Sequence, residues 1–353
     1  MKLVNRGFRD RDYVETEDGL FFTVVGNVHP KDRVLAYPKY LPSSRGRWGR
    51  GTKRYKRLIR YYSASNVMKE VDFLRRRYPQ YVFWSDSLNI FFPAVPLERI
   101  LRHYRPEELL KVIWDSDHSD RLQKKAIELT SLLSNESQVP RAHLGITGSI
   151  LLDVHNIRFS DIDLVVYGRV HSHSVKEALL SLYGKKEKVE RLRGKTLLNW
   201  CREQSSTHQL SIEETLALYG RKWNKGVFKN TVFSIHPVKV EDEAALEYGE
   251  ESYKSHGIVE ARAKVVDSRD ACFLPAIYFV DDVKSEDGIA DNRVERVVSF
   301  EELYVDIART GDTIMVRGKL EEVYDRSGRL KYHRILVGSF EARGSDFVKV
   351  PKP

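Results

Sequence analysis

The spacing of hydrophobic and polar residues predicts strands at both ends of the chain and an α/β region in its middle. In the first part, apolar runs closed by Gly or Pro indicate strands within residues 19–30, 32–42 and 80–95. Two segments that begin at or near a proline, residues 97–104 and 106–114, are predicted to be helices. We therefore expect a β-rich N-terminal region, residues 1–115, that ends in helices.

The middle of the chain combines helical periodicity with short apolar runs. Residues 119–135 carry apolar side chains every three or four positions behind a polar cap, and residues 211–214 form a capping box. A further helix is predicted at residues 175–183, and strands at 143–147, 161–167 and 231–240. This alternation is typical of a mixed sheet with flanking helices, an α/β or α+β domain, which we expect over residues 116–250.

The last hundred or so residues return to a β-type pattern. Apolar segments separated by turns span residues 258–266, 272–282, 293–300, 312–325 and 331–342. They suggest a small β-barrel resembling an OB-fold, residues 251–353, with an inserted helix at 300–308. Its aromatic residues are expected either to fill the core or to stack on nucleic-acid bases; they are Phe273, Tyr278, Phe279, Tyr324 and Tyr332.

Composition narrows the class of protein. The 353 residues include 59 Lys and Arg against 50 Asp and Glu, a formal charge of +9 that favours a polyanionic partner such as nucleic acid. Two cysteines are too few for a disulfide framework or a cysteine-based zinc site. No apolar run has the length of a membrane span and the first residues carry no apolar leader, so we expect a cytoplasmic protein.

Positive charge is concentrated between Arg45 and Tyr62. Eight of these eighteen residues are Lys or Arg, and glycines and aromatic residues are interleaved with them. This pattern is typical of a mobile arm that contacts a phosphate backbone, although a solvated basic loop has the same composition. The predicted nucleic-acid contacts are Arg47, Arg50, Lys53 and Arg54.

The stretch GITGSILLDVHNIRFSDIDLVVYG, residues 145–168, carries the candidate chemistry. Gly148 and Ser149 form a turn before a short apolar run, and Asp161 and Asp163 then project from one face of a predicted strand. Two carboxylates beside an apolar strand are costly to desolvate unless a cation or a basic side chain compensates them. An Asp-x-Asp pair alone is common at solvated strand ends and in salt-bridged pairs, and a Gly-Ser turn alone is also common. The prediction of a functional site therefore depends on the occurrence of both at this spacing.

The Gly-Ser turn followed after eleven residues by Asp-Ile-Asp resembles the signature of the nucleotidyltransferase superfamily that includes DNA polymerase beta, CCA-adding enzymes and minimal nucleotidyltransferases. The resemblance implies that Gly148 and Ser149 cradle a triphosphate and that Asp161 and Asp163 hold two Mg²⁺ (or Mn²⁺) ions. Over most of its length the chain also resembles an archaeal family of predicted nucleotidyltransferases, through GNVHPKDRVLAYPKY and SDIDLVVYG. Glycosyltransferases use Asp-x-Asp for metal too, but without a Gly-Ser turn expected at this distance.

One departure from the superfamily pattern concerns the third carboxylate, which is usually found on a later strand. The candidate strand, residues 231–240, offers Ser234 and His236 on one face and no acid. His236 is then a candidate metal ligand or general base, with Glu241 as an alternative, or an ordinary strand histidine. Basic residues just before this strand are candidates for triphosphate binding or for a solvated face, and they are Arg221, Lys222, Lys225 and Lys229.

These features predict a metal-dependent nucleotidyltransferase that takes an NTP or dNTP and transfers a nucleoside monophosphate to an acceptor hydroxyl. A nucleic-acid 3′ end, of RNA or DNA, is the favoured acceptor because of the basic segment and the barrel. Two rival functions are a protein-nucleotidylating enzyme of the same fold and a non-catalytic nucleic-acid-binding protein with a degenerate site.

Overall fold

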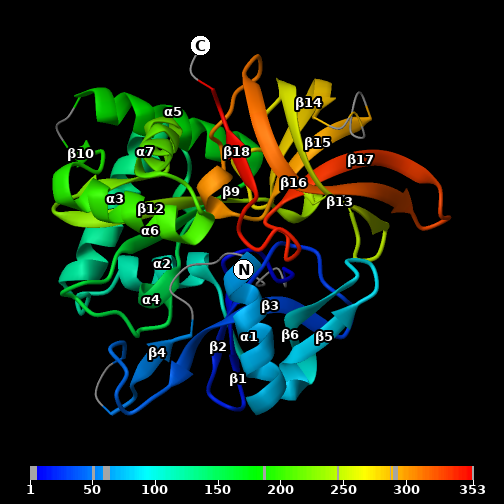
Figure 1. Cartoon of the computed structure of the whole chain (residues 1–353). Coiled ribbons are helices and arrows are strands. Elements are labelled where there is room, and N and C mark those ends of the chain that lie inside the picture. Colours follow the sequence, from blue (N-terminus) through cyan, green and yellow to red (C-terminus); the bar gives the residue numbers. More distant parts are fainter. Residues whose placement is uncertain are drawn as a thin grey trace. The chain divides into compact units, whose positions relative to one another are not determined.

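The structure of the chain is a computed structural model, which describes residues 6–49, 52–58, 64–185, 188–244, 246–286, 288 and 293–351 (Figure 1). The chain divides into two compact units, each assembled from segments that lie far apart in the sequence. The first unit contains residues 1–60, 93–192 and 223–245, and the second contains residues 61–92, 193–222 and 246–353.

A mixed sheet with helices on one face forms the centre of the first unit. Its strand order is β10-β11-β12-β9-β8, with β12 parallel to β9 and the other pairs antiparallel. The strands are β8 (Leu144–Ile146), β9 (Ile162–Tyr167), β10 (Val189–Glu190), β11 (Lys225–Phe228) and β12 (Thr231–Val238). The helices are α2 (Pro106–Trp114), α3 (Arg121–Ser137), the single turn α4 (Gly148–Leu151) and α5 (Arg169–Lys185). The predicted mixed sheet with flanking helices is therefore confirmed.

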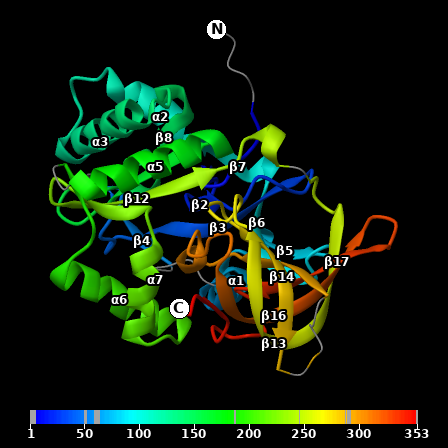
Figure 2. The same cartoon turned by 90° about the horizontal axis from the view of Figure 1, so that it is seen from above.

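The two faces of this sheet differ in what they bury. Ile162, Leu164 and Val166 of β9 are buried in one apolar cluster with residues of α2, α3 and α5, helices that lie together beside β12 in Figure 2. The alternating residues, Asp163 among them, are on the opposite face because side chains along a strand point to alternate sides. Asp120 caps α3 through a capping box with Gln123, as its sequence pattern predicts.

An antiparallel sheet from the N-terminal segment packs within the same unit. Its strand order is β5-β6-β3-β2-β1-β7, with β4 paired to β3. The strands are β1 (Tyr13–Thr16), β2 (Phe21–Val24), β3 (Arg33–Pro42), β4 (Tyr55–Arg57), β5 (Val82–Ser85), β6 (Ile90–Pro96) and β7 (Ile100–Tyr104), where β5 and the start of β6 belong to the second unit. The prediction of a helix at residues 97–104 is wrong. After a 3₁₀ turn at Leu97–Arg99, this segment extends and pairs with β1, since the edge of β1 offers it backbone partners that an isolated short helix lacks.

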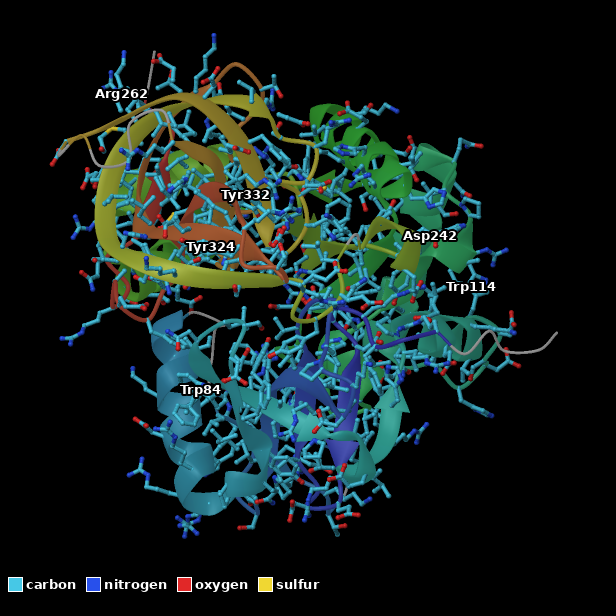
Figure 3. The ribbon with its side chains drawn as sticks, turned by 90° about the vertical axis from the view of Figure 1, so that its right-hand side faces the viewer. Trp84, Trp114, Asp242, Arg262, Tyr324 and Tyr332 are labelled. Atoms are coloured by element: carbon cyan, nitrogen blue, oxygen red, sulfur yellow. The ribbon has the colours of Figure 1, made fainter. Side chains whose placement is uncertain are left out.

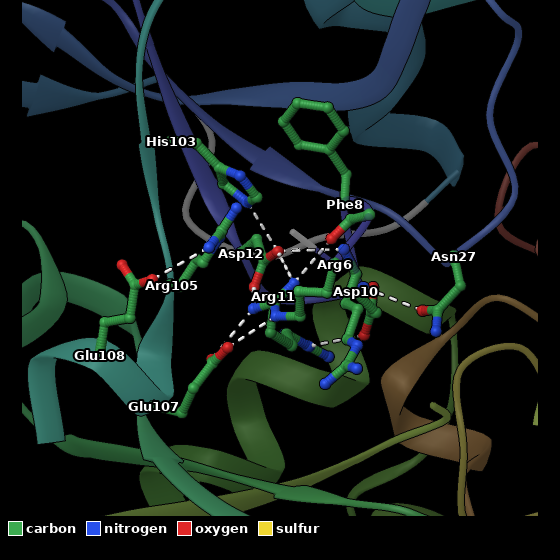
Figure 4. A network of polar contacts seen from close by, with 12 residues as sticks. Arg6, Phe8, Asp10, Arg11, Asp12, Asn27, His103, Arg105, Glu107 and Glu108 are labelled. Atoms are coloured by element: carbon green, nitrogen blue, oxygen red, sulfur yellow. Dashed lines mark hydrogen bonds and ion pairs between the residues drawn. The ribbon is translucent and has the colours of Figure 1, made fainter. Parts of the chain in front are cut away.

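Buried ion pairs join the N-terminal segment to the mixed sheet (Figure 4). Arg6 donates to Asp12 at 2.6 Å and to Glu107 of α2 at 2.6 Å. Tyr167 of β9 donates from its hydroxyl to the same Glu107 at 2.8 Å, and His103 lies 2.8 Å from Asp12. Burial raises the pKa of Glu107, but the hydrogen bonds and charge of Arg6 hold it below its usual value. The network fixes the N-terminal segment beside the mixed sheet.

A closed barrel of five strands forms the core of the second unit, as predicted. Its order is β13-β14-β15-β17-β16, closed by pairing of β13 with β16, and β15 is parallel to β17. This is the strand order of an OB-like barrel. The strands are β13 (Glu251–Asp267), β14 (Ala276–Ser285), β15 (Val294–Ser299), β16 (Thr313–Asp325) and β17 (Leu330–Val337), with β18 (Phe347–Lys349) added to β16.

The five aromatic residues singled out in the barrel are all buried or half-buried. Phe273 and Tyr278 are buried at 2% and 0% exposure, so they fill the core. Tyr324 and Tyr332 belong to β16 and β17 (Figure 3), where Tyr324 donates to Glu322. The guanidinium of Arg296 lies 3.8 Å from the ring centre of Tyr332 and 5.0 Å from that of Phe279.

Helical segments outside the barrel complete the second unit. They are α1 (Ala64–Arg77), α6 (Gly194–His208) and α7 (Ile212–Arg221), and β5 (Val82–Ser85) lies in the same unit. The prediction of a helix at 300–308 is wrong, because only Glu302–Tyr304 form a 3₁₀ turn. The side chains of Leu303 and Tyr304 are buried there in the barrel core, which favours an irregular turn over a solvated helix. None of the described helices combines the length and hydropathy that a membrane crossing requires.

Candidate nucleotidyltransferase site

The predicted site residues form a row across the mixed sheet, on the face opposite the helices. Ser234 of β12 is the register partner of Asp163 of β9, and Lys225 of β11 is the register partner of Ser234. On the other side, the backbone N–H of Thr147 donates to the carbonyl of Asp163 at 2.9 Å, which brings the turn after β8 beside β9. The sheet therefore gathers Gly148, Asp163, Ser234 and Lys225 from four separate strands or strand ends.

Asp163 is the electrostatic centre of this row. The hydroxyl of Ser234 donates to its Oδ1 at 2.5 Å, and His236 Nε2 lies 3.1 Å from the Ser234 oxygen and 3.7 Å from Oδ1. Burial raises the pKa of the Asp163 carboxyl, but the hydrogen bond and charge of His236, the hydroxyl of Ser234 and the charge of Lys225 together hold it well below its usual value. Asp163 is therefore ionised at neutral pH.

The role of His236 follows from its proton geometry. The Ser234 hydroxyl has one proton and donates it to Asp163, so in its contact with His236 the Ser234 oxygen is the hydrogen-bond acceptor. Nε2 of His236 then carries a proton and donates it to Ser234, with the ring buried at 7% exposure. In this arrangement His236 orients Ser234 and Asp163, and its role as metal ligand or general base stays a prediction.

Gly148 makes the closest approach to the carboxylate. Its φ is +68°, a left-handed conformation that only glycine adopts at little cost, and a Cβ on it would lie 2.4 Å from Asp163 Oδ2. The helix that it begins is one turn long, so the attraction for an anion at this turn must come from nearby N–H groups and cations and not from a helix dipole. Ser149 is buried at 3% exposure next to this turn.

Asp161 differs from Asp163 in its surroundings. Asp161 directly precedes the first residue of β9 and is exposed, whereas Asp163 lies within the strand and is half-buried. Carboxylates are preferred ligands of Mg²⁺, which commonly uses one or two of them and takes its remaining ligands from waters and substrate phosphates. Within the described residues there is no group of three or more acidic, His or Cys side chains placed to hold a metal ion. Asp161 and Asp163 are the two carboxylates that the structure places at the start of β9, and their role as metal ligands stays a prediction.

The other basic and acidic candidates have structural partners. Arg221 pairs with Asp312 at 2.8 Å, and the buried Lys222 donates to three backbone carbonyls, those of Glu302, Leu303 and Val305. In the first unit, Lys229 pairs with Glu128 at 2.6 Å, and Glu241 pairs with Arg9. Of the four basic candidates, Lys225 is the one whose charge acts on Asp163.

The described residues of the basic segment form strand pairings. Trp48 and Tyr55 form a bridge, and β4 pairs with β3, so residues 55–57 form a strand and not the expected loop. Arg47, Lys53 and Arg54 are exposed, and the guanidinium of Arg47 lies 4.9 Å from the ring centre of Phe159. Arg50 lies outside the described residues.

The structure also brings residues to the site that the sequence did not single out. Asp10 is buried at 5% exposure, accepts from the N–H of Gly26 at 3.0 Å and interacts electrostatically with His236, while burial raises the pKa of its carboxyl. The adjacent Arg11 has a φ of +69°, and its carbonyl accepts from the hydroxyl of Thr147 at 2.7 Å. No local sequence signal marks these residues, because their neighbours in space lie far away along the chain.

Comparison with known proteins shows a similarity that includes part of this site. Residues 129–217 match the family model described as a nucleotidyltransferase domain, a range that includes Gly148, Ser149, Asp161 and Asp163. The resemblance seen in the sequence is thus confirmed: residues 129–217 are similar to a nucleotidyltransferase domain. Ser234 and His236 lie beyond the matched range.

One relative extends the similarity to the whole chain. An uncharacterized protein of Methanocaldococcus jannaschii, MJ1086, is 29% identical over 346 residues, which cover 98% of this chain and 99% of the relative. The expected similarity to an archaeal protein over most of the length is therefore confirmed. No solved structure matches the chain at a significant level.

Proposed function

We propose that this protein is a metal-dependent nucleotidyltransferase. An acceptor hydroxyl attacks the α-phosphorus of an NTP or dNTP, the bond from that phosphorus to the bridging oxygen breaks, and pyrophosphate leaves with the hydroxyl proton passing to solvent. The observation that carries the proposal is the ionised Asp163 carboxylate, set against Gly148 and held by Ser234 inside a nucleotidyltransferase domain.

Two Mg²⁺ (or Mn²⁺) ions are expected, with Asp161 and Asp163 holding them. Bound metal would neutralise the triphosphate and increase the acidity of the acceptor hydroxyl. The protein's own groups prepare the site: Ser234 and His236 keep Asp163 ionised and oriented, and the charge of Lys225 favours an anionic substrate beside it. Gly148 and Ser149 let the backbone approach the phosphates closely, since no side chain intervenes at Gly148.

A nucleic-acid 3′ end is the acceptor that we propose. Arg47, Lys53 and Arg54 are exposed in the basic segment, within the same unit as Asp163, where they favour a polyanion. A protein acceptor would not need this charge, which makes protein nucleotidylation the second candidate. A non-catalytic nucleic-acid-binding protein is the third, because neither Ser234 nor His236 supplies the expected third acid.

The test is transfer of labelled nucleotide. The protein is incubated with each α-labelled NTP and dNTP, with Mg²⁺ or Mn²⁺, and with separate RNA, DNA and protein acceptors. We expect label on a nucleic-acid 3′ end, and a loss of several orders of magnitude in Asp163→Asn and Asp161→Asn proteins that retain the wild-type melting temperature. Label on protein would support the second candidate, and nucleic-acid binding without any transfer would support the third.

A further inference from the structure

Arg57 occupies an unusual position in the basic segment. Its neighbours Arg54 and Lys56 are exposed, whereas the Arg57 side chain is partly buried against aromatic rings. Its guanidinium carbon lies 4.8 Å from the ring centre of Trp48 and 5.4 Å from that of Tyr40. Nη2 also donates to the Tyr40 hydroxyl at 3.0 Å. These contacts hold the Arg57 side chain in one orientation, so a ligand that binds it loses less affinity to the ordering of that side chain.

One phenol connects Arg57 to α4, the single turn that begins at Gly148. Tyr40 is fully buried at 0% exposure, and its hydroxyl accepts from Arg57. Tyr40 also packs in an apolar cluster with Leu151, the last residue of α4, and Leu152, which follows it. The guanidinium is therefore tied through a single side chain to the turn beside Asp163.

The charge on Arg57 acts on the site. Burial lowers the pKa of the guanidinium, but interactions with Tyr40, Tyr13 and Asp163 keep it above its usual value. Lys225 acts on Asp163 from a different strand. The carboxylate is thus flanked by positive charge from the N-terminal sheet as well as from the mixed sheet.

Arg57 has hydrogen-bonding capacity left over. Its Nε is buried and has no hydrogen-bond partner among the residues that the structure describes. A buried unsatisfied donor is costly, and in a charged group the cost is larger. Guanidinium donors are arranged as a planar fork that matches the oxygens of a phosphate group. A phosphate oxygen that displaced the atoms covering Nε would satisfy the donor and place its negative charge against the guanidinium.

We propose that Arg57 binds phosphate oxygens of the nucleotide's triphosphate, so that the N-terminal sheet contributes a substrate-binding residue to the nucleotidyltransferase domain. The identity of the phosphate ligand rests on the proposed function. The alternative is a structural arginine that serves only to pack Trp48 and Tyr40.

Binding measurements separate these two roles. Isothermal titration calorimetry of the full chain would use ATP with Mg²⁺, inorganic tripolyphosphate with Mg²⁺, and adenosine, on wild type, Arg57→Gln and Arg57→Lys. Lys56→Gln is the matched control, because it removes the same charge from the exposed neighbour on the same strand. Melting temperatures establish that each variant is folded.

We expect Arg57→Gln to weaken binding of ATP and tripolyphosphate by roughly 10- to 100-fold, the range for one charge-assisted hydrogen bond in a protected site. Arg57→Lys keeps the charge but not the fork, so a smaller loss is expected, and it also serves if Arg57→Gln fails to fold. Binding of adenosine, and all binding by Lys56→Gln, should match wild type.

The outcomes distinguish this proposal from the proposed function. Unchanged ATP and tripolyphosphate affinity in folded Arg57 variants, with nucleotide transfer by wild type, overturns the role of Arg57 and leaves the transferase intact. Arg57-dependent tripolyphosphate binding without any transfer supports Arg57 and overturns the transferase. Wild-type protein that binds neither ATP nor tripolyphosphate overturns both.

Discussion

Replacement of Gly148 by alanine is the most direct test of the site geometry. The new Cβ would lie 2.4 Å from Asp163 Oδ2 and 3.3 Å from Asp163 Cβ and Cγ, so the carboxylate or the turn must move. A left-handed alanine costs about 1–2 kcal/mol, and overpacking adds about 1–3 kcal/mol. If the carboxylate shifts by about 1 Å, activity should fall roughly 100-fold.

Two other glycines separate backbone strain from displacement of the carboxylate. Gly19 lies in the same unit with a φ of +74°, and its Cβ would meet only Pro42 Cγ, at 3.4 Å. Gly19→Ala should therefore lose about 1–2 kcal/mol through strain and keep its activity. Gly184 in α5 has an ordinary helical backbone with nothing within 4 Å of a Cβ, so Gly184→Ala should be neutral or stabilise by up to about 1 kcal/mol.

The assay is nucleotide transfer per folded molecule, measured with thermal unfolding of the same samples. In a domain of this size, each kcal/mol corresponds to roughly 2–4 °C in melting temperature. Gly148→Ala should lose more stability than Gly19→Ala and should be the only one of the three that loses transfer. Equal activity in Gly148→Ala and Gly19→Ala would refute the reasoning, because Asp163 would then tolerate a side chain against it.

Three further predictions concern other parts of the first unit. His236→Ala should reduce nucleotide transfer because Ser234 loses the imidazole that orients it. If this variant keeps wild-type turnover, His236 is an ordinary strand histidine and Glu241→Gln becomes the next test. The four predicted nucleic-acid contacts are Arg47, Arg50, Lys53 and Arg54. Neutralising them together should weaken nucleic-acid binding, and the slope of log binding constant against log salt concentration should become shallower by roughly 0.7–0.9 per lost phosphate contact. Equal affinity and equal slope in wild type and variant would count against a role of this segment in binding. Glu107→Gln should cost about 1–3 kcal/mol near neutral pH because it leaves Arg6 buried with one partner fewer. The pKa of Glu107 is lowered in the folded protein, so the difference in unfolding free energy between wild type and Glu107→Gln should be largest above about pH 5. This difference should shrink as the pH falls through the folded pKa. A difference that stays constant down to about pH 3 would contradict the reasoning.

Local patterns in the sequence were sufficient for most elements. The period of apolar residues and the polar caps predicted α2, α3 and α7, and the barrel strands followed from apolar runs between turns. The errors came where local preference was weak: residues 97–104 became a 3₁₀ turn and the strand β7 because β1 offered pairing partners, and the helix expected at 300–308 is only a 3₁₀ turn. The helices α1 and α6 were not predicted. Short segments of this kind are decided by what they pack against.

What the sequence alone determined about the site was the motif itself, Gly148–Ser149 and Asp161–Asp163, because turn chemistry and strand alternation are properties of neighbouring residues. Tertiary structure decided the remainder: the register that sets Ser234 and Lys225 beside Asp163, and the packing of Tyr40, the partner of Arg57, against Leu151 and Leu152. Such contacts depend on strand pairing and burial between residues far apart along the chain. No periodicity within a short window encodes them, and only the folded chain brings these charges close enough to change one another's pKa.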